Sequence, residues 1–195
     1  MPADTPLDEF IPVPDVRERY AIEVAAPPEV VFQVAEQFDF QSVRLVRAIF
    51  TLRATLMRVR VPPRQPRGFL AEMEALGWGC LVRRPGELFI GGAACQPWEP
   101  EVKFRPIPAA DFAAFAEPNQ VKIAWTLEAR TLGPGRTRLA TETRAVATDA
   151  QARRRFRRYW RWARFGIIPI RWLLLPAIRK QAERQWRVAE AGRVA

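Results

Sequence analysis

Histidine is absent from this sequence, and its absence excludes several kinds of catalytic site. Without imidazole there is no Ser-His-Asp or Cys-His catalysis, no histidine metal ligand and no histidine acid or base. The two cysteines, Cys80 and Cys95, have no clustered acidic residues beside them, so we expect no zinc or iron site and no cofactor. Glycine-rich phosphate-binding motifs are missing as well. Any catalysis would therefore depend on Asp, Glu, Arg, Tyr, Thr or Ser.

Cysteine pairing and long apolar runs are also lacking. A turn at 84–87 would place Cys80 opposite Gly91, about four residues out of register with Cys95, which is too far for a disulfide. We expect two buried free thiols in a reducing compartment. The longest apolar run, 167–178, contains Arg171 and two prolines and is too short to cross a bilayer. The first residues resemble no secretory signal. A cytoplasmic protein is expected, with peripheral membrane contact left open.

Acidic residues are scarce in one C-terminal segment. Residues 153–187 carry twelve Lys or Arg and one acid, Glu183, a net charge of +11, whereas the whole chain has +10. A solvated helix face explains this, and nucleic acid is disfavoured because no binding motif accompanies the charge. Contact with an anionic membrane is the remaining alternative. Its candidate residues are Arg158, Arg161, Trp162, Phe165 and Trp172.

Length and composition are typical of one domain: 195 residues with 49% apolar content. We expect a proline-rich leader at 1–16, a single ligand-binding domain at 17–190 and a tail at 191–195. Hydrophobic periodicity predicts the elements of that domain. They are a strand at 17–24, helices at 29–38 and 42–57, a loop at 59–68, strands at 76–83, 88–95 and 102–105, an irregular link or helical turn at 106–119, and a hairpin at 121–130 and 136–147.

A long C-terminal helix follows, and Thr148 to Gln151 resembles a capping box with Thr148 at the N-cap. Gly166 and Pro169 predict a kink. At about 100° per residue, one stripe faces the core. Its members are Phe156, Tyr159, Trp160, Ala163, Ile167, Ile170, Leu174, Ala177 and Ile178. The aromatic or aliphatic residues that point away are Trp162, Phe165, Trp172 and Leu175.

The order of these elements resembles the helix-grip fold of the START-related superfamily, which includes polyketide cyclase/dehydrase and lipid-transport proteins. The resemblance rests on AIEVAAPPEVVFQVAEQF, LGWGC, ELFIGG, GRTRLATETRAVATD and the last helix. It implies an α+β fold with a curved antiparallel sheet of about six to seven strands wrapped around the C-terminal helix. It also implies a largely apolar cavity between sheet and helix.

The last hairpin predicts which residues face that cavity. A turn centred on Pro134 puts an apolar set on one face and a solvated charge ladder on the other. The cavity-side residues are Val121, Ile123, Trp125, Leu127, Leu139, Thr141, Thr143 and Ala145, and the ladder is Lys122, Glu128, Glu142 and Arg144. A slip of one residue would place Glu142 and Arg144 beside Trp125 as a binding or acid/base pair. The slip is disfavoured because burying the pair costs several kcal/mol in desolvation.

The sequence therefore predicts binding or transport of a hydrophobic small molecule or lipid, with no catalytic or metal-binding residue assigned. Ordinary core packing is the other explanation for each aromatic. The candidate cavity residues are Trp98, Ile123, Trp125, Thr141, Thr143, Phe156, Tyr159 and Trp160. One alternative is a cyclase/dehydratase-like enzyme acting on a polyketide-like substrate through Tyr159, Thr143 or an inward Glu142 and Arg144. Another is a membrane-surface or partner-binding module with a vestigial cavity.

Overall fold

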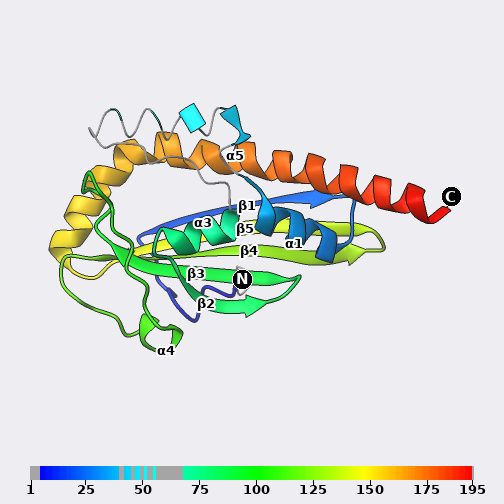
Figure 1. Ribbon diagram of the computed structural model, residues 1–195. Helices are drawn as coiled ribbons and strands as arrows, with labels where there is room; N and C mark the ends of the chain where they lie inside the picture. Colours follow the sequence, from blue (N-terminus) through cyan, green and yellow to red (C-terminus); the bar gives the residue numbers. More distant parts are fainter. Residues whose placement is uncertain are drawn as a thin grey trace.

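The structure, a computed structural model, is an α+β fold in which a curved five-stranded antiparallel sheet lies beneath one long helix (Figure 1). It describes residues 5–39, 42–44, 47, 48, 51, 55 and 68–194. The strands are β1 (Val16–Val24), β2 (Gly79–Arg84), β3 (Leu88–Cys95), β4 (Val121–Gly133) and β5 (Arg136–Ala147). The helices are α1 (Pro28–Gln37), α3 (Phe69–Ala75), α4 (Ala109–Phe112) and α5 (Ala150–Val194). The predicted fold class is confirmed.

The sheet has the strand order β1-β5-β4-β3-β2, and its five strands correct the predicted six to seven. The predicted strand at 102–105 forms one isolated bridge, Ala94 with Arg105, in the described chain. Proline precedes and follows this stretch and removes ladder donors. The predicted strand from Leu76 starts later, at Gly79, because the residues before it form α3.

The β4–β5 hairpin has the favoured register. Trp125 lies opposite Thr143, and Ile123 lies opposite Ala145. Gly135 closes the turn with φ +63°, a left-handed conformation that glycine adopts without strain. The alternative slip, which would have placed Glu142 beside Trp125, is therefore wrong.

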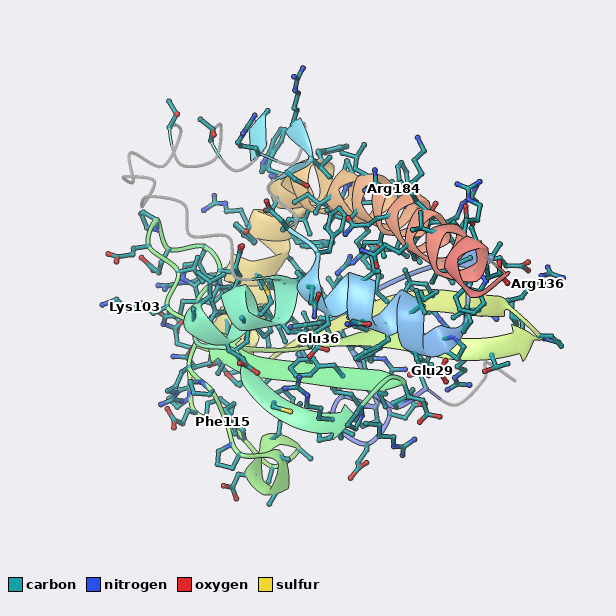
Figure 2. All side chains as sticks on the ribbon, turned by 45° about the vertical axis from the view of Figure 1, so that its right-hand side comes forward. Glu29, Glu36, Lys103, Phe115, Arg136 and Arg184 are labelled. Atoms are coloured by element: carbon teal, nitrogen blue, oxygen red, sulfur yellow. The ribbon has the colours of Figure 1, made fainter. Side chains whose placement is uncertain are left out.

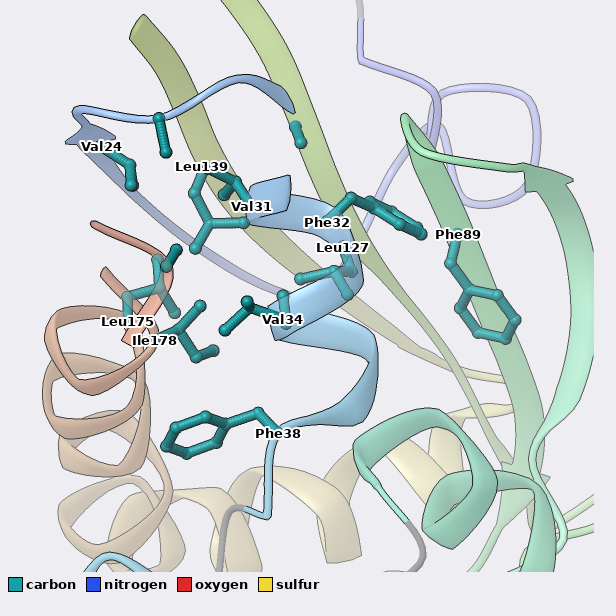
Figure 3. Packing of buried hydrophobic residues seen from close by; sticks show 14 of the residues in the cluster. Val24, Val31, Phe32, Val34, Phe38, Phe89, Leu127, Leu139, Leu175 and Ile178 are labelled. Carbon is teal, nitrogen blue, oxygen red and sulfur yellow. The ribbon is translucent and has the colours of Figure 1, made fainter. Parts of the chain in front are cut away.

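Helices α1, α3 and the C-terminal part of α5 cover one face of the sheet. Figure 3 shows Val31 and Val34 of α1 between the sheet and the α5 residues Leu175 and Ile178. Pro28 suits the first helical position of α1, where no amide donor is needed, and the apolar side of α1 is buried. Leu175 is 4% exposed, which corrects its predicted outward position. A bend in α5 changes the phase of its second half and accounts for this.

The opposite face of the sheet is covered too, by residues 5–15 and α4. Leu7, Ile11 and Phe112 are at most 1% exposed. Phe10 packs edge-to-face on Phe112 with ring centroids 5.9 Å apart. With Ile90 of β3 and other sheet residues, these side chains form a second apolar core. The sheet is thus the middle of three layers.

Helix α5 is capped by Asp149, one residue later than predicted. The Asp149 carboxylate accepts a hydrogen bond from the Ala152 amide at 2.8 Å. The Thr148 hydroxyl is engaged elsewhere, by the amide and carbonyl of Gln120 at 3.1 and 3.0 Å. An N-cap carboxylate is favourable at the positive end of a helix.

Helix α5 is continuous but bent. Figure 1 shows it changing direction where its colour passes from yellow to orange, although all of 150–194 is helical. Pro169 has no amide to donate to the carbonyl of Phe165, and its ring crowds that carbonyl. The predicted kink is therefore present, as a bend without a break in the helix.

Neither cysteine is in a disulfide, as expected, but the two differ in burial. Cys95 is buried, whereas Cys80 is exposed and corrects the prediction, because it lies on the edge strand β2. The predicted helix at 42–57 and loop at 59–68 lie largely outside the described residues. Within the described part, no helix has the length and hydropathy needed to cross a membrane.

Candidate functional site

One row of residues crosses the sheet beneath α5. Gly91 of β3 pairs with Trp125 of β4, Trp125 with Thr143 of β5, and Thr143 with Glu18 of β1. Paired residues of adjacent strands share a face, with Cβ atoms about 5 Å apart. We call Trp125, Thr143 and Glu18, together with Arg171 of α5, the polar row.

Arg171 joins α5 to this row. Its guanidinium donates a hydrogen bond to the hydroxyl of Thr143. Burial lowers the pKa of Arg171, and the negative charge of Glu18 acts against that shift. No carboxylate of the described residues lies within salt-bridge distance of Arg171. A guanidinium has five N–H donors, and within the described residues the Thr143 hydroxyl is the acceptor that Arg171 reaches.

Trp125 forms the apolar end of the row. Its ring contacts Phe69, Trp78 and Phe89, with centroids 5.2, 6.1 and 5.3 Å apart. It lies directly on Gly91, where a Cβ would come within 2.7 Å of the indole. The indole nitrogen is buried and has no hydrogen-bond partner in the described structure. An unsatisfied buried donor is unusual in a folded protein.

The sheet surface around the row is not tightly covered. Ile123, Thr141 and Thr143 are half-buried although they lie on the inner strands β4 and β5 and face α5. Thr126, Glu142 and Arg144, on the other face of the same strands, are at most 4% exposed. At these positions the α5 side of the sheet is therefore more open to solvent than the far side.

The predicted cavity residues fall into two groups. Trp125 belongs to the core shared with α1 and the C-terminal part of α5. A second cluster surrounds the first turns of α5 and holds Ile123, Trp98, Phe156, Tyr159 and Trp160. Thr141 and Thr143 lie on the α5 side of the sheet, and the polar row falls at the boundary between the two clusters. Phe156 is 2% exposed, and its place in a ligand cavity stays a prediction.

Three of the four charged ladder residues on the far face, Lys122, Glu142 and Arg144, are buried, which corrects the prediction that they are solvated, and Glu128 is half-buried. Arg144 is 1% exposed and donates hydrogen bonds to Glu142 at 2.7 Å, Asp8 at 2.6 Å, Thr5 at 2.6 Å and the carbonyl of Ile11 at 2.7 Å. Burial alone would lower the pKa of Arg144, but its bonds to the two carboxylates outweigh this and raise it. The leader segment, not a ligand, satisfies this charge.

Lys122, on the same face, also makes its hydrogen bonds within the protein. Its ammonium donates to the carbonyls of Phe112 and Ala113 at 3.0 and 2.7 Å. Burial lowers the pKa of Lys122. It therefore holds the end of α4 and is not available to a ligand on the α5 side.

A large hollow and a metal-binding group of side chains are two other marks of a functional site, and in the described structure neither involves a residue of the polar row. A hollow of about 560 Å³ is lined by Arg44, Arg47, Ala48, Thr51 and Thr55, none of which is a predicted site residue. In the described residues there is no group of three or more His, Cys, Asp or Glu that would hold a metal ion. The cavity predicted against Trp125 stays a prediction.

Sequence reasoning missed Arg171 and Glu18. The signal for Arg171 was its position, four residues after Ile167 and three before Leu174, both of which belong to the stripe predicted to face the core. The signal for Glu18 was its alternation with Tyr20 and Ile22, which share its face of β1.

Comparison with known proteins adds little beyond the fold. No protein-family model and no curated protein matches the sequence significantly. The crystal structure of the Zhui aromatase/cyclase from Streptomyces sp. R1128 is similar over 89% of this chain and 97% of that one, with 13% identity and a TM-score of 0.30. At this level the similarity says nothing about activity or ligand.

Proposed function

We propose that this protein binds a hydrophobic small molecule or lipid between the sheet and α5, and that the polar row holds the polar end of that molecule. The observation that carries the proposal is Arg171. It is a desolvated cation in an otherwise largely apolar layer, and the hydroxyl of Thr143 is its hydrogen-bond partner.

An arginine in this position is costly without an acceptor. Taking a charge out of water is unfavourable by several kcal/mol unless other groups pair with it. A carboxylate, phosphate or carbonyl on a ligand would pair with the guanidinium, and guanidinium favours such oxygens in bidentate geometry. The indole N–H of Trp125, which has no hydrogen-bond partner in the described structure, would add a second donor.

The apolar groups on both sides of the row fit the rest of such a ligand. Trp125 and its aromatic neighbours lie on one side, and Ile123, Tyr159 and Trp160 lie on the other. Ligand sites are commonly apolar walls with a few converging polar groups. Transport of the bound molecule would use the same site.

The direct test is native mass spectrometry of freshly purified protein, followed by displacement of an apolar fluorescent probe. A long-chain fatty acid and the alcohol of equal length serve as ligands. We expect the acid to bind more tightly, and Arg171→Gln to weaken the acid roughly tenfold or more while leaving the alcohol nearly unchanged, because a hydrogen bond to a charged group is worth about 1.5 to 3 kcal/mol.

Arg187→Gln is the matched control, because Arg187 is an exposed arginine of the same helix. It should bind both ligands like the unmodified protein. Urea unfolding of Arg171→Gln should show little loss of stability. Failure of both ligands to displace the probe, or an equal loss of acid and alcohol binding in Arg171→Gln, would contradict the proposal.

A cyclase/dehydratase-like enzyme is the second candidate, and Glu18 is the observation that favours it. Glu142 lies on the far face and cannot act as a base in this site, but Glu18 lies beside Thr143 and within electrostatic reach of Arg171. A carboxylate and a guanidinium are suitable for removing a proton next to a carbonyl and stabilising the enolate. Turnover of a linear polyketide-like substrate that is lost in Glu18→Gln would support this function over binding alone.

A further inference from the structure

The outer side of α5 carries a stripe of alternating arginines and aromatic residues. Trp162, Phe165 and Trp172 are 70%, 66% and 59% exposed, the largest aromatic surfaces open to solvent among the described residues. Exposed arginines lie beside them on the same side of the helix. We call this set the cationic stripe, and it consists of Arg154, Arg158, Arg161, Trp162, Phe165 and Trp172.

Helical spacing explains the stripe. At about 100° per residue the five positions from Arg154 to Phe165 fall within roughly 100° of arc around α5, opposite the side that contacts the sheet. Trp172 lies beyond the bend and is exposed there. The guanidinium of Arg161 lies 5.8 Å from the ring centroid of Trp162, which keeps charge and aromatic surface together. The helix thus has one side committed to the core and one side with exposed apolar rings.

Charge identifies what this side would contact. No acidic residue occurs between Ala150 and Ala182. No carboxylate in this part of the helix therefore offsets the positive charge that the stripe presents to a partner. Exposed aromatic residues among arginines are typical of helices that lie in the headgroup region of an anionic membrane. A second copy of this chain would present the same positive charge and would be repelled.

We infer that the cationic stripe docks α5 on an anionic membrane surface, with Trp162, Phe165 and Trp172 inserted among the headgroups and the arginines on the lipid phosphates. This inference goes beyond the proposed ligand site and is tested without a ligand. The bend near Pro169 sets the angle between the two parts of the stripe, so Trp172 would contact the surface at a different tilt from Trp162.

Co-sedimentation with vesicles tests the inference. Vesicles of phosphatidylcholine alone are compared with vesicles that also contain phosphatidylglycerol, at low and high salt. We expect binding only to the anionic vesicles, and a marked loss at high salt because screening acts over about 8 Å at physiological ionic strength. Arg158→Gln with Arg161→Gln should lower the partition coefficient roughly tenfold or more, since each basic residue near the surface contributes about 1 kcal/mol.

Matched controls separate the stripe from net charge. Arg136→Gln with Arg138→Gln removes the same charge at the tip of the β4–β5 hairpin, where Figure 2 labels Arg136, and should bind like the unmodified protein. Trp162→Ala with Phe165→Ala should weaken binding, whereas Leu76→Ala with Leu132→Ala, two exposed apolar residues elsewhere, should not.

Three results would overturn the inference. One is equal binding to neutral and anionic vesicles, or none to either. Another is an equal loss in the stripe and hairpin variants, which would mean that net charge alone acts. The third is duplex DNA that binds with a steep salt dependence and displaces the vesicles, which would assign the stripe to nucleic acid.

Discussion

The two faces of the sheet use arginine in opposite ways. On the far face, Arg144 is fully paired by carboxylates, a hydroxyl and a carbonyl of the leader and β5. On the α5 face, Arg171 has the Thr143 hydroxyl as its partner and no carboxylate in salt-bridge distance among the described residues. Arg144 therefore serves the structure, whereas the desolvated charge of Arg171 is the basis of the proposed binding site.

The two faces also differ in closure. The far face is sealed by a segment of the same chain, whereas the α5 face keeps half-buried residues on its inner strands. The proposed ligand site therefore lies in the more open of the two layers. The far face of the sheet thus belongs to a closely packed core, and the α5 face belongs to a more open layer.

Replacing Arg144 should lower the free energy of unfolding by the largest amount of all the substitutions proposed. A small loss would contradict the contrast between the two faces. Arg144→Ala removes the guanidinium that Asp8 and Glu142 share. Glu142 keeps its ion pair with Arg17, at 2.9 Å. Removing one partner of a buried pair costs about 3 to 5 kcal/mol. Urea unfolding measures the loss. Arg138→Ala, an exposed arginine of the same strand, should change stability by less than about 0.5 kcal/mol. A loss below about 1 kcal/mol for Arg144→Ala would mean that the far face is not sealed as described.

Adjacent glycines of β3 allow each face to be perturbed separately. A Cβ at Gly91 would meet the indole of Trp125 at 2.7 Å, and a Cβ at Gly92 would meet Leu81 at 2.5 Å and Phe112 at 2.7 Å. We expect Gly91→Ala and Gly92→Ala each to cost about 1 to 3 kcal/mol, the overpacking range, with Gly91→Ala costing more because the indole cannot bend away.

The readout that separates them is ligand binding. Displacement of the apolar probe should change in Gly91→Ala, whose contact lies in the polar row, and stay unchanged in Gly92→Ala. A change in binding of equal size in both variants would mean that the two layers are coupled through the sheet.

Acid should weaken the far face by a smaller amount. Hydrogen bonds from the Thr5 amide and from Arg144 hold the pKa of Asp8 below its ordinary value of 3.8. A lowered pKa in the folded state adds stability at higher pH, and this contribution is lost as the pH falls below 3.8 and through the folded value. The difference in urea midpoint between the protein and Asp8→Asn should therefore shrink on acidification. A difference that stays constant with pH would show that Asp8 acts through packing alone.

The sequence was sufficient to predict the register of the hairpin and therefore which residues share a face. Alternation and a turn centred on Pro134 fix that geometry locally, and Trp125 and Thr143 lie where they were expected. The same pattern could not show that the face of Arg144 is buried, because its cover comes from Leu7 and Ile11, more than 130 residues away in sequence. The polar side chains of this face suggested contact with solvent, whereas other segments of the chain provide their hydrogen-bond partners.

Arg171 and its neighbours on α5 show a second reason why sequence-based prediction was incomplete. Its position on the apolar side of α5 is readable from the spacing, but the bend that decides the phase of the second half is not. Leu175 was misplaced for that reason. The N-cap also shifted, to Asp149, because the hydroxyl of Thr148 bonds to Gln120 on a distant loop. Local patterns predicted the elements, and contacts between distant segments decided their details.

The close approach of Trp125 to Gly91 has a consequence for sequence variation among relatives of this protein. Because the indole occupies the volume that any side chain at position 91 would need, a relative with a larger residue at 91 must have a smaller one at 125. Position 92 is linked in the same way to positions 81 and 112, on the other side of the sheet. Substitutions at 91 and 125 should therefore covary as one pair, independently of the set formed by 92, 81 and 112.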